Sequence, residues 1–168
     1  MLTNDGLTIS MIAKIRQFKT ELGSGAEAGS LSEILSYIES YEPGNGQNRV
    51  DRVYGNHVAA LSQTDLDLQG SLTGPFGDTI SFPIVMGLIV KNLSRTSGQS
   101  VIVGGGTNPW LTHLGAGGDI VKIGPQGMLF LWSPLDGYAT TAGTGDILRL
   151  DPSSGTPEVA YLILGRSA

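Results

Sequence analysis

The sequence predicts a mainly β protein, an antiparallel β-sandwich or jelly-roll-like module preceded by a short helical N-terminal segment. Five of the six Glu residues lie before residue 50, whereas seven of the eight Pro residues follow it. Glu is compatible with helices, whereas Pro marks turns and sheet edges. Glycine makes up 25 of the 168 residues and charged residues only 15%, which is typical of a turn-rich chain whose surface is poor in charge. We therefore expect a helical segment over residues 1–50 and a β module over 51–168.

The prediction of two N-terminal helices depends on apolar residues spaced three and four positions apart. The first helix is predicted from about Thr8 to Leu22. The second begins at Ser30 or Ser32, because Ser30 and Glu33 have capping-box spacing, and ends near Tyr41. The apolar stripe of the first helix is a candidate docking face, and its residues are Ile9, Ile12, Ile15, Phe18 and Leu22. The alternative interpretation is that this stripe simply packs on the β module.

From about Arg52 the apolar residues recur at every second position, which is the pattern of a half-buried strand. Ile80 and Phe82 alternate with polar residues, and Val121 and Ile123 do the same. Turn sequences rich in Gly and Pro separate such runs, as at residues 74–77 and 124–127. Eight or nine short strands are expected, at the spacing typical of a sandwich or barrel.

Three of these strands are apolar on both faces, at residues 84–90, 128–132 and 161–164. A strand with one wet face alternates apolar and polar residues, so each of these must have its second face covered. The cover is the N-terminal helices, neighbouring copies of the chain or another protein, and the low charge favours a protein contact. The candidate subunit-interface residues on these strands are Val85, Ile89, Leu129, Leu131, Leu162 and Leu164.

The motifs that carry chemistry are absent from the sequence. Cysteine is absent and the two histidines, His57 and His113, are far apart, so no thiolate site or histidine cluster is expected. The glycines at 104–106 lack the Gly-Lys-Ser/Thr of a phosphate loop and are interpreted as a hairpin turn. Asp65 and Asp67 lack the continuation of a calcium loop. We therefore expect no enzyme activity, no cofactor and no metal.

The two tryptophans, Trp110 and Trp132, are the aromatic residues that could contact a ligand such as a sugar. Trp132 lies in an apolar run and is interpreted as a core residue, whereas Trp110 follows Pro109 at a loop edge. Trp110 is therefore a weak ligand candidate, because an exposed aromatic ring can stack on a sugar. This feature keeps open a rival class, a carbohydrate-binding or host-receptor module.

The charge and hydropathy of the chain bear on its partners. A net charge of −5 and a pI near 4.8 are unfavourable for nucleic acid, because binding needs cations for the phosphates. The longest apolar stretch, residues 84–90, is far shorter than the ~20 residues of a membrane-spanning helix. The N-terminus lacks the pattern of a signal peptide. We therefore expect a soluble protein that binds neither nucleic acid nor membrane.

Several segments resemble small virion proteins of tailed bacteriophages, of the head decoration (cement) or head-fibre type. The resemblance covers about residues 52–168 and is carried by residues 64–82, 88–94, 120–127, 137–150 and 159–165. It implies a β-sandwich that assembles as a homo-oligomer, often a trimer, without catalytic residues. It also implies a location on the capsid surface, bound to the major capsid protein, after synthesis in the host cytoplasm. The alternative is a tail, baseplate or fibre component that binds host-surface carbohydrate or a receptor.

Overall fold

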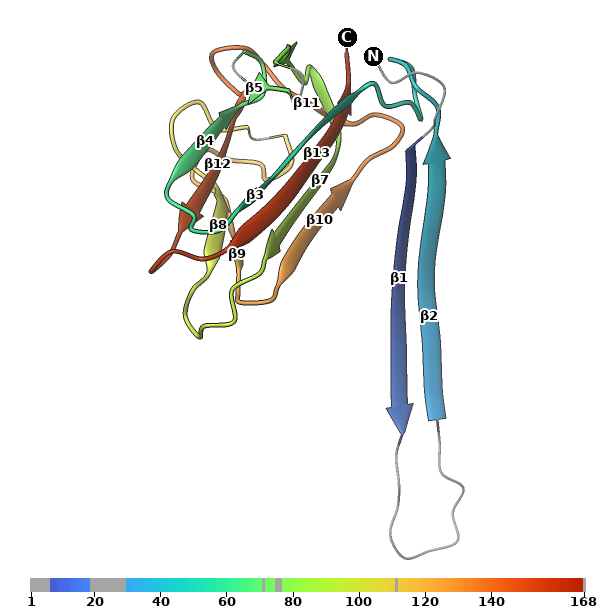
Figure 1. The fold of residues 1–168 in the computed structure, drawn as a ribbon. Helices are drawn as coiled ribbons and strands as arrows, with labels where there is room; N and C mark the ends of the chain where they lie inside the picture. Colours follow the sequence, from blue (N-terminus) through green and yellow to red (C-terminus); the bar gives the residue numbers. More distant parts are fainter. Residues whose placement is uncertain (1–6, 19–29, 71, 75–76, 111, 168) are drawn as a thin grey trace, which may run out of the picture.

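The computed structural model of the chain describes residues 7–18, 30–70, 72–74, 77–110 and 112–167 (Figure 1). Within these residues the fold is mainly β, every paired strand is antiparallel and no helix occurs. The strands are β1 (Leu7–Phe18), β2 (Ser30–Tyr41), β3 (Arg52–Val58), β4 (Thr64–Asp67), β5 (Leu72–Thr73), β6 (Thr79–Ile80), β7 (Ile84–Asn92), β8 (Val101–Gly104), β9 (Ile120–Ile123), β10 (Met128–Trp132), β11 (Tyr138–Ala139), β12 (Ile147–Pro152) and β13 (Val159–Arg166).

Two larger sheets form the body of the molecule. One has the strand order β10-β7-β13-β3, with β11 also paired to β7, and the other has the order β4-β12-β8-β9. Figure 1 shows the two sheets next to each other, with β1 and β2 as a separate long ribbon beside them. The short strands β5 and β6 pair with each other.

One hydrophobic core joins the two larger sheets. It includes Leu88 and Ile163 from the first sheet and Val103 and Leu150 from the second, all with 0% exposure. Phe82, from the connection between β6 and β7, is also fully buried in it. Burial of such side chains is worth ~1.5–3 kcal/mol each, so the packing of one sheet on the other supplies the driving force for folding the body.

The expected pattern of strands and turns over residues 52–168 is largely confirmed. The described part of this region holds eleven strands, and three of them (β5, β6 and β11) have only two residues, too few for an alternation to be visible in the sequence. The predicted turn at 124–127 joins β9 to β10, where the Gly127 amide donates to the Gly124 carbonyl at 2.9 Å. Gln126 adopts a positive φ of 61° there.

The prediction of two N-terminal helices is wrong for the described residues, because Leu7–Phe18 and Ser30–Tyr41 are antiparallel strands. The apolar residues of 7–15 recur at positions 7, 9, 11, 13 and 15 as well as at helical spacing, so both periods fit. The four serines of the second strand are weaker helix formers than alanine or leucine. The isoleucines of both strands favour an extended chain. The remainder of the first predicted helix, including Leu22, lies outside the described residues.

A β-bulge between β13 and β7 changes which residues share a face. The register shifts between Leu164 and Gly165, so that Gly165 lies opposite Val85 rather than Met86. A Cβ on Gly165 would stand 2.5 Å from the Ile84 carbonyl oxygen, which is why glycine fits at this position. As a consequence, the odd-numbered Val85 lies in the shared core together with the even-numbered Leu88 and Val90 of the same strand.

Candidate functional site

The face of the β10-β7-β13-β3 sheet that lies away from the shared core is the candidate functional site, and we call it the outer face. Cross-strand partners lie on the same face of a sheet, and the register sets out three rows of four residues. The first row is Trp132, Gly87, Leu164 and Val53. The second row is Phe130, Ile89, Leu162 and Gly55. The third row is Met128, Lys91, Ala160 and His57.

The first row is closed by the chain itself. Leu164 is 1% exposed, and it packs in a small second core with Val50 and Met86. Trp132 lies over Gly87, because a Cβ on that glycine would stand 2.2 Å from the Trp132 ring. Trp132 also stacks on Phe130 of the second row, with ring centroids 6.2 Å apart. This end of the outer face is therefore a packed part of the monomer.

The second and third rows remain partly open to solvent. Phe130, Ile89 and Leu162 are half-buried, and Met128 is 55% exposed. Lys91 is exposed and has no ion-pair partner among the described residues. A contiguous apolar area on a sheet face is characteristic of an interaction surface.

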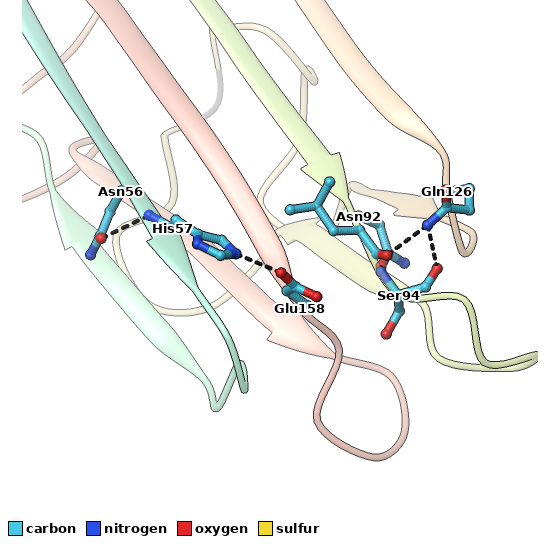
Figure 2. A network of polar contacts seen from close by, with 7 residues as sticks. Asn56, His57, Asn92, Ser94, Gln126 and Glu158 are labelled. Carbon is cyan, nitrogen blue, oxygen red and sulfur yellow. Dashed lines mark hydrogen bonds and ion pairs between the residues drawn. The ribbon is translucent and has the colours of Figure 1, made fainter.

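Polar groups lie at the His57 end of the third row and beyond its other end. His57 Nε2 lies 2.7 Å from Glu158 Oε1, and both side chains are exposed (Figure 2). On the other side the Gln126 Nε2 donates to the carbonyl oxygens of Leu93 and Ser94 at 2.6 and 3.0 Å. An apolar centre with a polar border is the usual anatomy of a protein–protein interface.

The polar border rests on a buried amide at the end of β7. Asn92 is 0% exposed, and its Nδ2 donates to the carbonyl oxygens of Gln99 and Ile123 at 2.8 and 3.2 Å. Its Oδ1 accepts from the Ser94 amide at 3.1 Å. Asn92 therefore fixes the loop after β7, and the Asn-Leu-Ser sequence at 92–94 is not an accessible glycosylation site.

The structure separates the six candidate interface residues. Ile89 and Leu162 lie in the second row of the outer face, and Leu164 lies in its closed first row. Val85 is 0% exposed in the shared core, and Leu129 and Leu131 pack against that core. The choice of these last three as interface residues is therefore corrected, because the register pairs Leu129 with Val90 and Leu131 with Leu88 on the face of the sheet that meets the shared core.

The residues of the outer face that sequence reasoning missed as interface candidates are on β10. Phe130 pairs with Ile89 and Met128 pairs with Lys91. The apolar run of β10 was recognised, but an apolar run gives no sign of which alternate residues point inward. Only the pairing register decides between the two sets.

The candidate docking face at the N-terminus does not form one stripe. In the β register Ile9 and Ile15 lie on one face of the ribbon, whereas Ile12 and Phe18 lie on the other. The fifth residue, Leu22, lies outside the described residues. The stripe is a property of a helix, so its loss follows directly from the strand geometry.

Trp110 is a core residue, which corrects the expectation of an exposed ring. It is 1% exposed and its Nε1 donates to the Ala139 carbonyl at 3.0 Å. Its ring lies 4.0 Å from that of His113 and makes an edge contact with Tyr138. Burial lowers the pKa of His113 to about 4. A ring enclosed in this way offers no face on which a sugar could stack.

The acidic pair on β4 is engaged in local structure. Arg149 of β12 donates to both carboxylate oxygens of Asp65 at 2.7 and 2.8 Å. These hydrogen bonds hold the pKa of Asp65 below its usual value. Asp67 accepts from the Gln69 amide at 2.9 Å. The described residues contain no group of three potential metal ligands, and no helix among them is long and apolar enough to span a membrane.

Comparison with known proteins gives no relative: no family model, no curated protein and no solved structure matches the chain.

Proposed function

We propose that the chain is a non-enzymatic structural protein of a virion, a capsid decoration (cement) protein that binds and stabilises the head shell as a homo-oligomer. Its two antiparallel sheets with one shared core support a β-sandwich, jelly-roll-like oligomerisation module. Its partners in this proposal are further copies of itself, as a trimer, and the major capsid protein. The protein is then located on the capsid surface after synthesis in the host cytoplasm.

The observation that carries the proposal is the half-open apolar outer face. Full burial of a large apolar side chain is worth ~1.5–3 kcal/mol. Phe130, Ile89 and Leu162 are already partly buried, so covering what remains exposed gains at most about a third of that value at each. Together with burial of the exposed Met128, this gain favours association through a face that is repeated in each copy.

Symmetry makes a homo-oligomer suitable for a shell. A capsid presents the same site many times, and a symmetric oligomer offers one weak contact for each subunit. Linking these contacts raises the overall affinity without any new interaction. The low charge of the chain, 15% of residues, agrees with a surface used for protein contact.

The proposal is tested with two matched variants, Met128→Asn and Ile120→Asn, which replace an apolar side chain by a neutral polar one. Met128 on the outer face is 55% exposed and Ile120 on β9 is 53% exposed, so neither change disturbs the monomer core. We expect light scattering to show an oligomer for the unchanged chain and for Ile120→Asn, and a shift toward monomer for Met128→Asn, whose amide a neighbour must desolvate. Co-sedimentation with capsid shells is expected to be retained by Ile120→Asn and reduced by Met128→Asn. A monomeric unchanged chain that does not sediment with shells would contradict the proposal.

A further inference from the structure

The β1–β2 ribbon has no strand partner within its own chain among the described residues. Its two strands pair with each other over twelve residues each, and neither pairs with any other described strand. At about 3.3 Å per residue the ribbon is roughly 40 Å long. An isolated two-stranded hairpin is only marginally stable in water, so a ribbon of this kind needs a surface on which to pack.

The register of the ribbon separates its residues into an apolar and a polar face. Cross-strand partners such as Leu7 and Tyr41, or Ala13 and Leu35, fall on the same face. The first face, which we call the apolar ribbon face, is Leu7, Ile9, Met11, Ala13, Ile15, Gln17, Leu31, Glu33, Leu35, Tyr37, Glu39 and Tyr41. The opposite face is Thr8, Ser10, Ile12, Lys14, Arg16, Phe18, Ser30, Ser32, Ile34, Ser36, Ile38 and Ser40.

The connection from the ribbon to the body is fixed at the closed end of the outer face. The Asn48 amide donates to the Pro134 carbonyl at 3.0 Å, and the Asp51 amide donates to the Gly165 carbonyl at 3.1 Å. Val50 between them is 1% exposed in the second core. From this root the ribbon extends past the body, as Figure 1 shows. The open rows of the outer face remain uncovered by it, since Met128 is 55% exposed.

The two unpaired surfaces of the chain are complementary in charge as well as in polarity. The apolar ribbon face contains two acidic residues, Glu33 and Glu39. The outer face contains one cation, Lys91, that has no ion-pair partner among the described residues. Lys91 can pair with either carboxylate but not with both, since Glu33 and Glu39 are six residues apart on β2, and this opposite charge favours contact between the two surfaces.

We propose that the apolar ribbon face packs on the outer face of a second copy of the chain. This inference rests on the proposed homo-oligomer and adds the segment that builds it. Packed sheets stand about 10 Å apart, and the ribbon then covers the second and third rows, which include Phe130, Ile89 and Met128. A contact between two different surfaces of the chain runs from each copy to the next, and it closes into a ring such as a trimer when the rotation between copies closes.

The absence of cysteine allows a direct test with the full chain. A ribbon variant, Met11→Cys, is mixed with a sheet variant, Leu162→Cys, that carries a larger tag, and a short bis-maleimide is added. The matched control is Ser10→Cys, one residue away on the opposite ribbon face. We expect a cross-linked species of mixed size with Met11→Cys and a large loss of that species with Ser10→Cys. A double variant, Met11→Cys with Leu162→Cys, is treated at high dilution to detect contact within one chain.

Each outcome of this experiment decides one question. Equal cross-linking from both ribbon faces, or no mixed species while light scattering still shows an oligomer, overturns the ribbon contact and leaves the proposed function intact. Efficient cross-linking within the diluted double variant shows that the ribbon covers its own outer face, and this overturns the contact between copies. A chain that is monomeric in light scattering overturns the proposed homo-oligomer itself.

Discussion

Trp132 of β10 lies against Gly87 of β7, at a distance that leaves no room for a side chain on the glycine. The contact closes the first row of the outer face, where Leu164 and Val50 are buried beside it. Trp132 also stacks on Phe130, which the register places in the open second row. The glycine therefore separates a closed from an open part of one sheet face.

Gly87→Ala is expected to destabilise the protein, although alanine is ordinarily the better residue within a strand. The new Cβ would stand 2.2 Å from the Trp132 ring, and overpacking of this kind costs ~1–3 kcal/mol. The measurement is the free energy of unfolding in urea. Gly124→Ala is the control, because nothing lies within 4 Å of its Cβ position. Equal stability of the two variants would contradict this account of the Trp132 contact.

Asn92→Ala is expected to lower the free energy of unfolding by about 1–3 kcal/mol, because the change leaves buried groups without their hydrogen-bond partners. The groups affected are the carbonyl oxygens of Gln99 and Ile123 and the amide of Ser94. Thermal and urea denaturation measure the effect. Gln63→Ala, which removes an exposed side-chain amide just before β4, is the control and is expected to change stability little. A loss no larger than that of the control would exclude a structural role for the Asn92 amide.

His113 is expected to make stability fall as the pH drops from about 6.5 toward 4. Burial lowers its pKa from 6.5 to about 4, so between these values the unfolded chain binds a proton that the folded chain does not. The stabilising contribution is present above pH 6.5 and is lost as the pH falls through the folded pKa. Unfolding curves at pH 7.5 and 4.5 measure the loss, and His113→Phe is expected to reduce it while keeping a ring against Trp110.

A second titrating group, Asp65, changes the stability of the protein over a different pH range from His113. The pKa of Asp65 is held below 3.8 by its hydrogen bonds with Arg149, so the stability that it contributes is present above 3.8 and is lost only at lower pH. An unchanged dependence on pH between 6.5 and 4 in His113→Phe would therefore show that another group is responsible.

Phe130→Asp is expected to disrupt assembly or folding, because the change places a charge on the outer face where a neighbour must desolvate it. Phe130→Leu keeps an apolar side chain at this half-buried position and is expected to retain the oligomer. Light scattering and the melting temperature are the two measurements. Normal oligomer size together with normal melting in Phe130→Asp would contradict the packing argument.

Local patterns in the chain are enough to predict where the body is β and where it turns. The apolar run Val159–Leu164 identifies β13, and Gly-Pro-Gln-Gly at 124–127 identifies the turn into β10, because both signals are local. Such patterns also identify the strands that are apolar on both faces. These properties depend on neighbours in the chain alone.

Which of those apolar residues face the core depends on how the strands pair in the folded chain. Leu129 and Phe130 are adjacent and equally apolar, yet only the pairing of Phe130 with Ile89 places it on the outer face. Residues 7–18 satisfy a helical and a strand period at once, and pairing with 30–41 selects the strand. Trp110 has the sequence setting of a loop residue, yet it lies in the core, because residues far from it in the sequence cover its ring. Register and pairing join residues far apart in sequence, so no local pattern contains them.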